Sequence, residues 1–174
     1  MHVAFVGPYQ CGKTTLINEL EAYYTSSDPL LDTLPTITPC VRQVRFGDCD
    51  LILIDTAGME RFACINRVSV RSADVIVSCQ ELMCIGQEEY LAPNSRSLQD
   101  LMYEVCNSPV VVPVYTKSDL CTAFDCFDAG MFITTTHSVQ SFHCLAEYIA
   151  KLAESRMWHE RVALAEREEK RGCC

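Results

Sequence analysis

The first loop of the chain reads Gly7-Pro8-Tyr9-Gln10-Cys11-Gly12-Lys13-Thr14, which is the pattern G-x-x-x-x-G-K-T. It directly follows an apolar run at residues 3–6, and a helical pattern begins at Thr14. A loop of this kind turns backbone N–H groups inward around an anion, and the positive end of the helix faces the same anion. The stretch therefore predicts a phosphate-binding loop, against the alternative of a chance glycine turn.

The residues of this loop have distinct expected roles. Gly7 and Gly12 permit the backbone angles that the turn needs. Lys13 supplies a positive charge to the β- and γ-phosphates of a nucleotide, and the Thr14 hydroxyl is a ligand for Mg²⁺. The full set predicted to contact nucleotide in this loop is Gly7, Tyr9, Gln10, Cys11, Gly12, Lys13, Thr14 and Thr15.

The composition limits the class of protein and its partners. The chain has 174 residues, enough for one domain, and its net charge of −9 disfavours nucleic acid as a partner. We find no apolar stretch long enough to span a membrane and no signal-peptide pattern. The twelve cysteines include no CxxC pair. We interpret five of them as small apolar residues that fill space in the core: Cys11, Cys64, Cys79, Cys106 and Cys144. Disulfides or a structural metal site are the alternatives.

Short apolar runs alternate with helical patterns, which is typical of an α/β fold. Gly47 and Asp48 form a hairpin turn, so one edge strand of a mostly parallel six-stranded sheet is antiparallel. Segment 121–130 leaves room for about one helical turn, so the helix before the last strand is shortened or absent. Strands are predicted at residues 3–6, 41–46, 51–54, 74–79, 110–115 and 131–134, and helices at 14–25, 61–70, 97–105 and from 139 past 152.

The last predicted helix leads into a charged C-terminal segment. Its apolar face is formed by Leu145, Tyr148, Ile149 and Leu152. Residues 155–174 are mostly charged and polar with mixed sign, either a tail or a continued helix, without a core of their own. We therefore expect a domain at residues 1–154, with three α/β/α layers, and a tail at residues 155–174.

Two further motifs follow predicted strands. Asp55-Thr56-Ala57-Gly58-Met59 ends one strand, and Thr116-Lys117-Ser118-Asp119 ends another. With the phosphate loop, they resemble the motifs of the Ras superfamily of small GTPases, and the Rab branch most closely. The resemblance covers residues 1–152 and the last two residues. It implies the P-loop NTPase fold of a small-GTPase domain, with GTP, GDP and Mg²⁺ as its ligands.

The resemblance also implies roles for residues near the phosphates. An aspartate like Asp55 holds Mg²⁺ through water, and a glycine like Gly58 donates its N–H to the γ-phosphate. Thr36 aligns with the switch threonine whose hydroxyl meets Mg²⁺, although Thr33 and Thr38 are close enough to leave the register open. The predicted metal ligands are thus Thr14, Thr36 and Asp55. Because the γ-phosphate exists only in GTP, its contacts can pull these loops into order.

The third motif concerns the base. Asp119 can accept two hydrogen bonds from the N1–H and the exocyclic amine of guanine, a donor pair that adenine lacks, so it selects GTP over ATP. The stem of Lys117 can lie on the base, and Thr116 stands where asparagine is commoner. In the poorly matching run Thr134-Thr135-Thr136-His137, the Thr136 N–H is placed to read guanine O6. Thr135, Thr136 and His137 complete the predicted nucleotide site.

Two residues depart from the family pattern. Met59 stands where the family has the glutamine that orients the attacking water, and a thioether cannot orient water as an amide does. Tyr9 replaces a small residue beside the phosphates, where its ring could obstruct an activator's arginine finger. We expect slow hydrolysis from a catalytic set of Lys13, Thr36, Gly58 and Met59. The alternative is that Tyr9 lies outward and a partner supplies the missing group.

The chain ends in Cys173 and Cys174, which resemble the Rab signal for double geranylgeranylation. Two lipid chains meet the requirement for stable membrane anchoring, and two exposed thiols are the alternative. The resemblance implies a monomeric GTP/GDP switch of vesicle trafficking, cytoplasmic and peripheral on an endomembrane. It also implies an exchange factor, a GDI-type escort and effectors as partners. The alternatives are a guanine-nucleotide-binding module with little hydrolysis that recruits effectors constitutively, and a P-loop kinase, which the second and third motifs disfavour.

Overall fold

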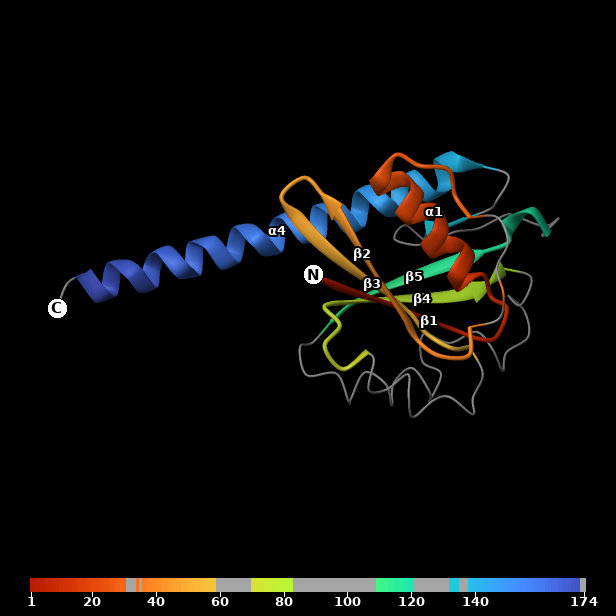
Figure 1. The fold of residues 1–174 in the computed structure, drawn as a ribbon, viewed down its shortest axis with the longest axis horizontal. Coiled ribbons are helices and arrows are strands. Elements are labelled where there is room, and N and C mark those ends of the chain that lie inside the picture. Colours follow the sequence, from red (N-terminus) through yellow and green to blue (C-terminus); the bar gives the residue numbers. More distant parts are fainter. Residues whose placement is uncertain are drawn as a thin grey trace.

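The computed structural model describes residues 1–30, 34, 36–58, 70–82, 109–120, 132–134 and 138–172. Figure 1 shows a central sheet with a long C-terminal helix that extends beyond it. The elements are β1 (His2–Val6), α1 (Lys13–Thr25), β2 (Cys40–Phe46), β3 (Cys49–Asp55), β4 (Val75–Glu81), β5 (Val110–Thr116), the 3₁₀ turn η3 (Ser118–Leu120), β6 (Phe132–Ile133) and α4 (Val139–Gly172).

The six strands form one sheet in the order β2-β3-β1-β4-β5-β6. β2 runs antiparallel to β3, and the other neighbouring pairs are parallel. Gly47, with φ 57°, makes the hairpin turn between β2 and β3. The predicted mostly parallel sheet with one antiparallel edge strand is therefore confirmed. Because parallel strands end at the same edge, the carboxyl ends of β1, β3, β4 and β5 lie there, where such folds bind ligands.

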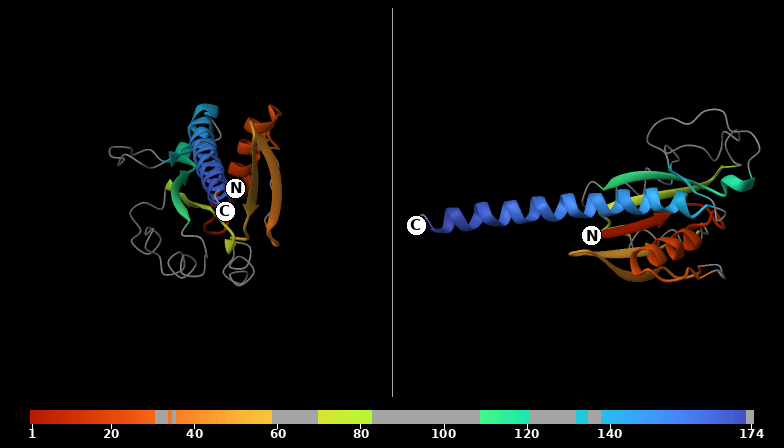
Figure 2. Two further views of the ribbon diagram at one scale, coloured as in Figure 1. Left: turned by 90° about the vertical axis from the view of Figure 1, so that its left-hand side faces the viewer. Right: turned by 90° about the horizontal axis from the view of Figure 1, so that it is seen from above.

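Both faces of the sheet are packed, because alternate residues of a strand point to opposite sides. Val3 and Phe5 belong to a core shared with α1 and α4, whereas Ala4 and Val6 belong to a second core on the other face. Figure 2 shows α1 and α4 on the same side of the sheet. The α/β fold is as predicted; the helices expected at residues 61–70 and 97–105, apart from Val70, and the segment 121–130 lie outside the described residues.

α1 and α4 bury apolar residues against each other. The Tyr24 hydroxyl of α1 donates a hydrogen bond to the Ala146 carbonyl of α4 at 2.7 Å. The buried positions of α4 are Phe142, Leu145, Ala146, Ile149, Ala150 and Ala153. Tyr148 is 38% exposed and Cys144 is exposed, so the predictions that Tyr148 lies on the packed apolar face and that Cys144 is an apolar filler were wrong. The buried set follows the 3.6-residue helical period, and small alanines take the places where α4 approaches its neighbours.

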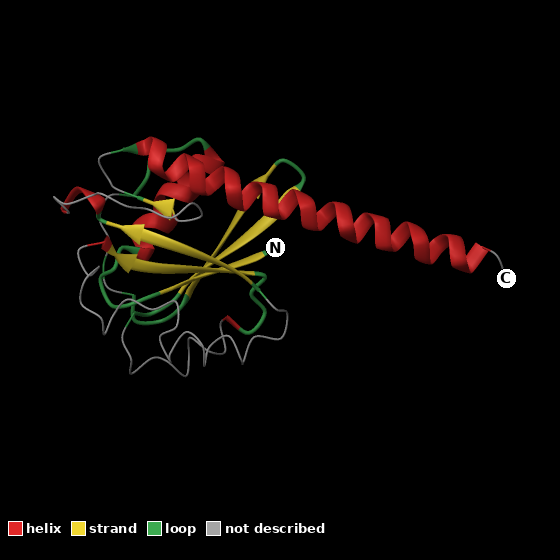
Figure 3. Cartoon of the chain, turned by 180° about the vertical axis from the view of Figure 1, so that it is seen from behind, coloured by secondary structure: helices red, strands yellow, loops and turns green. Residues whose placement is uncertain are grey.

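α4 spans 34 residues and continues past the sheet to Gly172, as Figure 3 shows from behind. Beyond residue 154, Arg156 still forms an ion pair with Asp74, the residue before β4, and the Cys49 thiol lies 3.0 Å from the Met157 sulfur. The next residue, Trp158, is 62% exposed. The body therefore contacts α4 a few residues beyond the expected domain boundary. Among the described helices, none combines the length and apolar composition needed to cross a membrane.

Candidate functional site

The loop between β1 and α1 depends on glycine at two positions. Gly7 has φ 152°, and a Cβ atom there would lie 2.2 Å from the Cys79 carbonyl oxygen. Gly12 has φ 87° and begins α1 as its N-cap, where its carbonyl accepts the Leu16 N–H at 2.9 Å. Gln10 also adopts a left-handed conformation, with φ 59°. The expected strand–loop–helix geometry is therefore present, and two of its three positions with positive φ are glycines, which adopt that conformation freely.

The Lys13 side chain lies inside this loop and is 5% exposed. Its ammonium group donates hydrogen bonds to the carbonyl oxygens of Gly7 at 3.1 Å and Pro8 at 2.8 Å. Gly58, from the segment after β3, lies against the same point. A Cβ atom on Gly58 would come within 2.6 Å of the Pro8 oxygen and 2.7 Å of the Lys13 nitrogen. The second motif thus touches the phosphate loop beside its lysine, where the chain has no room for a side chain.

The three predicted metal ligands lie together. The Thr14 hydroxyl donates to Asp55 Oδ2 at 2.7 Å and lies 3.0 Å from the Thr36 hydroxyl, which is 3.2 Å from the same oxygen. Asp55 is 2% exposed, and its Oδ1 atom has no hydrogen-bond partner among the described residues. A buried carboxylate oxygen left unpaired beside two hydroxyls is a donor set that suits Mg²⁺, which prefers oxygen ligands. The residues present therefore fit the cation, and Thr36 is the threonine that reaches the cluster.

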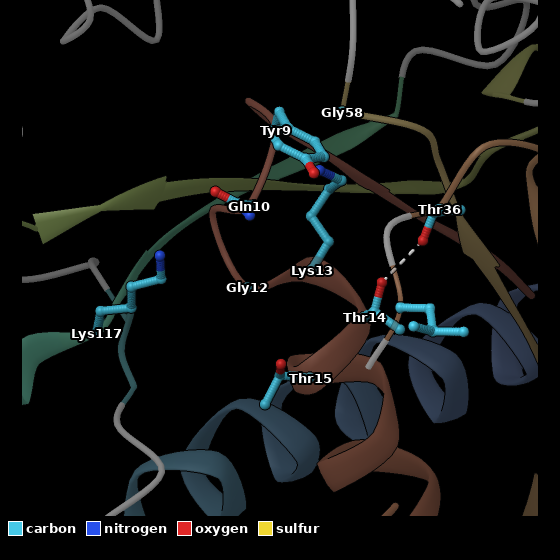
Figure 4. Close-up of a pocket in the computed structure, with 10 residues that line it drawn as sticks. Tyr9, Gln10, Gly12, Lys13, Thr14, Thr15, Thr36, Gly58 and Lys117 are labelled. Carbon is cyan, nitrogen blue, oxygen red and sulfur yellow. Dashed lines mark hydrogen bonds between the residues drawn. The ribbon is translucent and has the colours of Figure 1, made fainter. Parts of the chain in front are cut away.

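These residues line one pocket of about 470 Å³. Figure 4 shows Lys13, Thr14 and Thr36 pointing into it, with Tyr9 and Gly58 at one end and Lys117 on the opposite wall. Tyr9 lines the pocket while 39% exposed, so it lies at the rim and not away from the site. Leu34 also lines it, and no sequence pattern singled that residue out. The complete lining is Tyr9, Gln10, Gly12, Lys13, Thr14, Thr15, Leu34, Thr36, Gly58 and Lys117.

The third motif begins with a buried hydroxyl. Thr116 is 4% exposed, and its hydroxyl lies 2.6 Å from the Cys11 carbonyl oxygen and 3.1 Å from that of Gln80. The threonine in place of the commoner asparagine thus joins β5 to both the phosphate loop and β4. Lys117, with φ 56°, forms an ion pair with Glu81 at the end of β4. Sequence reasoning missed Glu81, although an acidic residue at the end of the neighbouring parallel strand was a usable signal.

Other predicted residues are less closely assembled. Asp119 lies in η3, is exposed, and is not among the pocket-lining residues. Thr134 pairs with β5 through its N–H, which donates to the Tyr115 carbonyl at 2.8 Å. Met59, Thr135, Thr136, His137, Cys173 and Cys174 lie outside the described residues, as do Thr33, Cys64 and Cys106.

The buried cysteines near the pocket have raised pKa values. Burial raises the pKa of the Cys11 thiol, and it raises the pKa of the Cys79 thiol well above the ordinary range. Both stay neutral, as expected of small apolar fillers. Within the part of the chain that the structure describes, no three His, Cys, Asp or Glu side chains gather as a metal site.

Comparison with known proteins agrees with this geometry. A family model described as "50S ribosome-binding GTPase" matches residues 2–117. The chain is also 32% identical, over 123 residues, to the protein named GTPase Der from Nitrobacter hamburgensis. That alignment covers 67% of this chain and 26% of Der, so the chain spans about a quarter of the length of its curated relative. Residues 2–117, which the family model matches, contain the phosphate loop, the segment up to Gly58 and the start of the third motif.

Proposed function

Since the chain belongs to the GTPase family described as 50S ribosome-binding GTPases, we propose that it is a switch controlled by GTP and GDP. One observation carries the proposal: the segment after β1, the segment before β2 and the end of β3 meet around one buried cluster. Thr14, Thr36 and Asp55 share hydrogen bonds there, and Gly58 lies against Lys13. A γ-phosphate bound at this point would contact both the loop of Thr36 and that of Gly58, and its loss would release them.

Different residues of the pocket have different roles in binding and hydrolysis. Backbone N–H groups of the loop and the Lys13 ammonium bind the phosphates and stabilise the charge that develops as water attacks the γ-phosphorus. The bond between that phosphorus and the β–γ bridging oxygen breaks, giving GDP and inorganic phosphate. Thr14, Thr36 and Asp55 would hold Mg²⁺, directly or through water, and its charge would neutralise phosphate oxygens. Gly58 places its backbone next to Lys13, where the γ-phosphate would lie.

We propose that intrinsic hydrolysis is slow. Met59 follows Gly58 directly and offers a thioether instead of a side chain that orients water. Tyr9 supports the same proposal, since it lines the pocket and its Cα lies beside the place where a Gly58 side chain would begin. A ring at that rim would obstruct an activator's arginine. The second candidate is therefore a module that binds guanine nucleotide and scarcely hydrolyses it.

Single-turnover hydrolysis of GTP tests both candidates. We expect a low rate for the natural chain and a rate about 10- to 100-fold higher for Met59→Gln, because the amide can orient water. Met59→Leu is the matched control, being apolar and similar in size, and it should leave the rate low. A natural chain that already turns over as fast as Met59→Gln would overturn the proposal of slow hydrolysis. Failure to bind GTP in preference to ATP would overturn the switch itself and favour a kinase.

The finer proposal is a Rab-like switch of vesicle trafficking, anchored by geranylgeranyl groups on Cys173 and Cys174. It is supported by the motifs and by α4, which extends beyond the body and ends one residue before these cysteines. Such a protein would be a monomer on the cytosolic face of an endomembrane. An exchange factor, a GDI-type escort and effectors would be its partners.

In vitro prenylation and vesicle flotation test the finer proposal. The full chain treated with geranylgeranyl diphosphate and the matching transferase should float with neutral vesicles. A chain with both Cys173→Ser and Cys174→Ser should stay in solution, and Cys144→Ser, at an exposed cysteine on α4, should float like the natural chain. A natural chain that takes up no lipid would count against membrane anchoring but leave GTP binding untouched.

A further inference from the structure

Glu81 and Lys117 form an ion pair at the wall of the nucleotide pocket. From this pair we infer that Glu81 is a positioning residue: its carboxylate holds the Lys117 ammonium so that the lysine stem forms the pocket wall. The inference rests on the proposed function, because the ligand against that wall is a nucleotide. It assigns a role in nucleotide retention to a residue outside the three sequence motifs.

The sheet register brings the two side chains together. Glu81 is the last residue of β4, and it pairs in parallel register with Thr116, the last residue of β5. Lys117 follows directly and has φ 56°, a left-handed conformation that a side chain adopts at some cost. The Leu120 N–H donates to the Lys117 carbonyl at 3.1 Å, so η3 fixes the backbone after the bend. The pair therefore joins two rigid strand ends.

Partial burial separates the roles of the lysine's head and stem. The side chains of Lys117 and Glu81 are 34% and 28% exposed, so the pair is half-buried. Lysine can cover apolar surface with its methylene stem while its charged head binds elsewhere. With the head committed to Glu81, the stem is fixed at the pocket wall, where a flat base can lie on it.

The charges around the pair argue against simple attraction of phosphate by Lys117. Lys13 already lies among the carbonyls of the phosphate loop. Lys117 has a carboxylate as its direct partner, so the pair brings little net charge to the pocket. Loss of Glu81 would free the lysine to change rotamer, and the wall would lose its fixed shape. We therefore expect bound nucleotide to dissociate faster when Glu81 is replaced. Charge repulsion alone would predict the opposite, because the substitution removes a negative charge near an anionic ligand.

Dissociation of a fluorescent N-methylanthraniloyl-GDP from the full chain tests the inference. Glu81→Gln should raise the dissociation rate about tenfold, and Lys117→Met should raise it at least as much. The double variant should dissociate no faster than Lys117→Met alone, because Glu81 acts through the lysine. Single-turnover hydrolysis at saturating GTP should be unchanged in Glu81→Gln, since Lys117 lies apart from Gly58 in the pocket (Figure 4).

Glu21→Gln is the matched control. Glu21 also forms a partly buried ion pair, with Arg42, and its side chain is 34% exposed. This variant removes the same charge from a different pair and should change dissociation less than twofold. If Glu81→Gln folds poorly, as a lowered unfolding temperature would show, Glu81→Asp keeps the charge and shortens its reach. Glu81→Asp should raise the dissociation rate by a smaller factor. In a chain that also carries Lys117→Met, it should raise the rate no further.

Three results would overturn the inference. Slower dissociation from Glu81→Gln would mean that the carboxylate repels nucleotide. Additive effects in the double variant would mean that Glu81 acts independently of Lys117. An effect of Glu21→Gln as large as that of Glu81→Gln would mean a general loss of charge or stability. By contrast, a natural chain that binds no N-methylanthraniloyl-GDP would contradict the proposed function itself, so the two failures are distinguishable.

Discussion

The two ends of the nucleotide pocket are built differently. At the phosphate end, Lys13 is 5% exposed and Asp55 is 2% exposed, and their partners come from backbone carbonyls and neighbouring hydroxyls. At the base end, Lys117 is about one-third exposed and Asp119 is exposed outside the pocket lining. The comparison teaches that buried contacts within the protein organise the phosphate end, whereas among the described residues the wall of the base end depends on the half-buried ion pair of Lys117 and Glu81.

The largest effect should come from Asp55→Ala at the phosphate end. The substitution removes a carboxylate that accepts hydrogen bonds from Thr14 and Thr36 and whose other, buried oxygen has no partner among the residues that the structure describes, which leaves it for Mg²⁺. We expect GTP affinity with Mg²⁺ to fall by about 3 kcal/mol, or more than 100-fold. Isothermal titration calorimetry with and without EDTA measures the GTP affinity. In EDTA, Asp55→Ala and the natural chain should bind GTP equally well.

Asp50→Ala is the control, an exposed aspartate on the same strand, and it should bind like the natural chain. An Asp55→Ala protein that keeps its response to Mg²⁺ would show that the cluster is not the cation site. It would also remove the basis for calling the phosphate end the more organised of the two.

Asp119→Ala should have the next largest effect, at the base end. Its carboxylate is expected to accept two hydrogen bonds from guanine, so its loss should reduce the preference for GTP over ATP by about 2 kcal/mol, roughly 30-fold. Competition of each nucleotide against a fluorescent GDP measures the ratio. ATP affinity should not change, nor should the ratio in the control Asp28→Ala, which is exposed beyond α1. An unchanged ratio in Asp119→Ala would place guanine recognition elsewhere.

Much of the phosphate end follows from the sequence because its residues are close together along the chain or directly follow a strand. The glycine spacing around Lys13 determines the loop, and the apolar run before Asp55 places that carboxylate at the same sheet edge as β1. Thr36 was uncertain by a few residues, because its register depends on how the loop before β2 closes. Its hydrogen bonds to Thr14 and Asp55 decide among the described threonines.

The base end was harder to predict because its contacts join residues far apart in sequence. Glu81 meets Lys117 through the register of β4 against β5, and its acidic side chain becomes a usable signal only once that pairing of strands is known. The hydroxyl of Thr116 reaches the Cys11 carbonyl across 105 positions of sequence. Along α4 the predicted apolar face was wrong at Tyr148. The prediction favoured large apolar side chains, whereas small alanines occupy several of the buried positions. The helical period is kept along α4, but tertiary packing decided which of its faces is buried and which residues meet at the base end.

Gly58→Ala should have a smaller effect, confined to the phosphate end. Its methyl group would meet the Pro8 oxygen at 2.6 Å and the Lys13 nitrogen at 2.7 Å, so the segment must move away from the loop. We expect affinity for a non-hydrolysable GTP analogue to fall about tenfold with GDP affinity unchanged, since one charge-assisted hydrogen bond is lost.

The matched control is Gly47→Ala in the β2–β3 turn, where a Cβ atom meets nothing within 4 Å. Its positive φ should cost about 1 kcal/mol of folding free energy without changing the ratio of GTP to GDP affinity. Equal losses for both nucleotides in Gly58→Ala would mean that Gly58 shapes the loop and does not read the γ-phosphate.

The smallest effect, from Thr116→Val, tests whether the two ends are coupled. The substitution keeps the side-chain shape but removes the hydroxyl that joins Cys11 in the phosphate loop to Gln80 on β4. We expect about 1 kcal/mol of lost nucleotide affinity, a fall of roughly fivefold, because one hydroxyl hydrogen bond typically contributes that much. Thr116→Ser retains the hydroxyl, so its loss of nucleotide affinity should be less than half of that in Thr116→Val.

If the ends are coupled through Thr116, a double variant of Thr116→Val with Lys117→Met should lose less nucleotide affinity than the sum of the two single losses. Additive losses would mean that each end binds its part of the nucleotide independently, and the buried hydroxyl would then be a feature of folding alone.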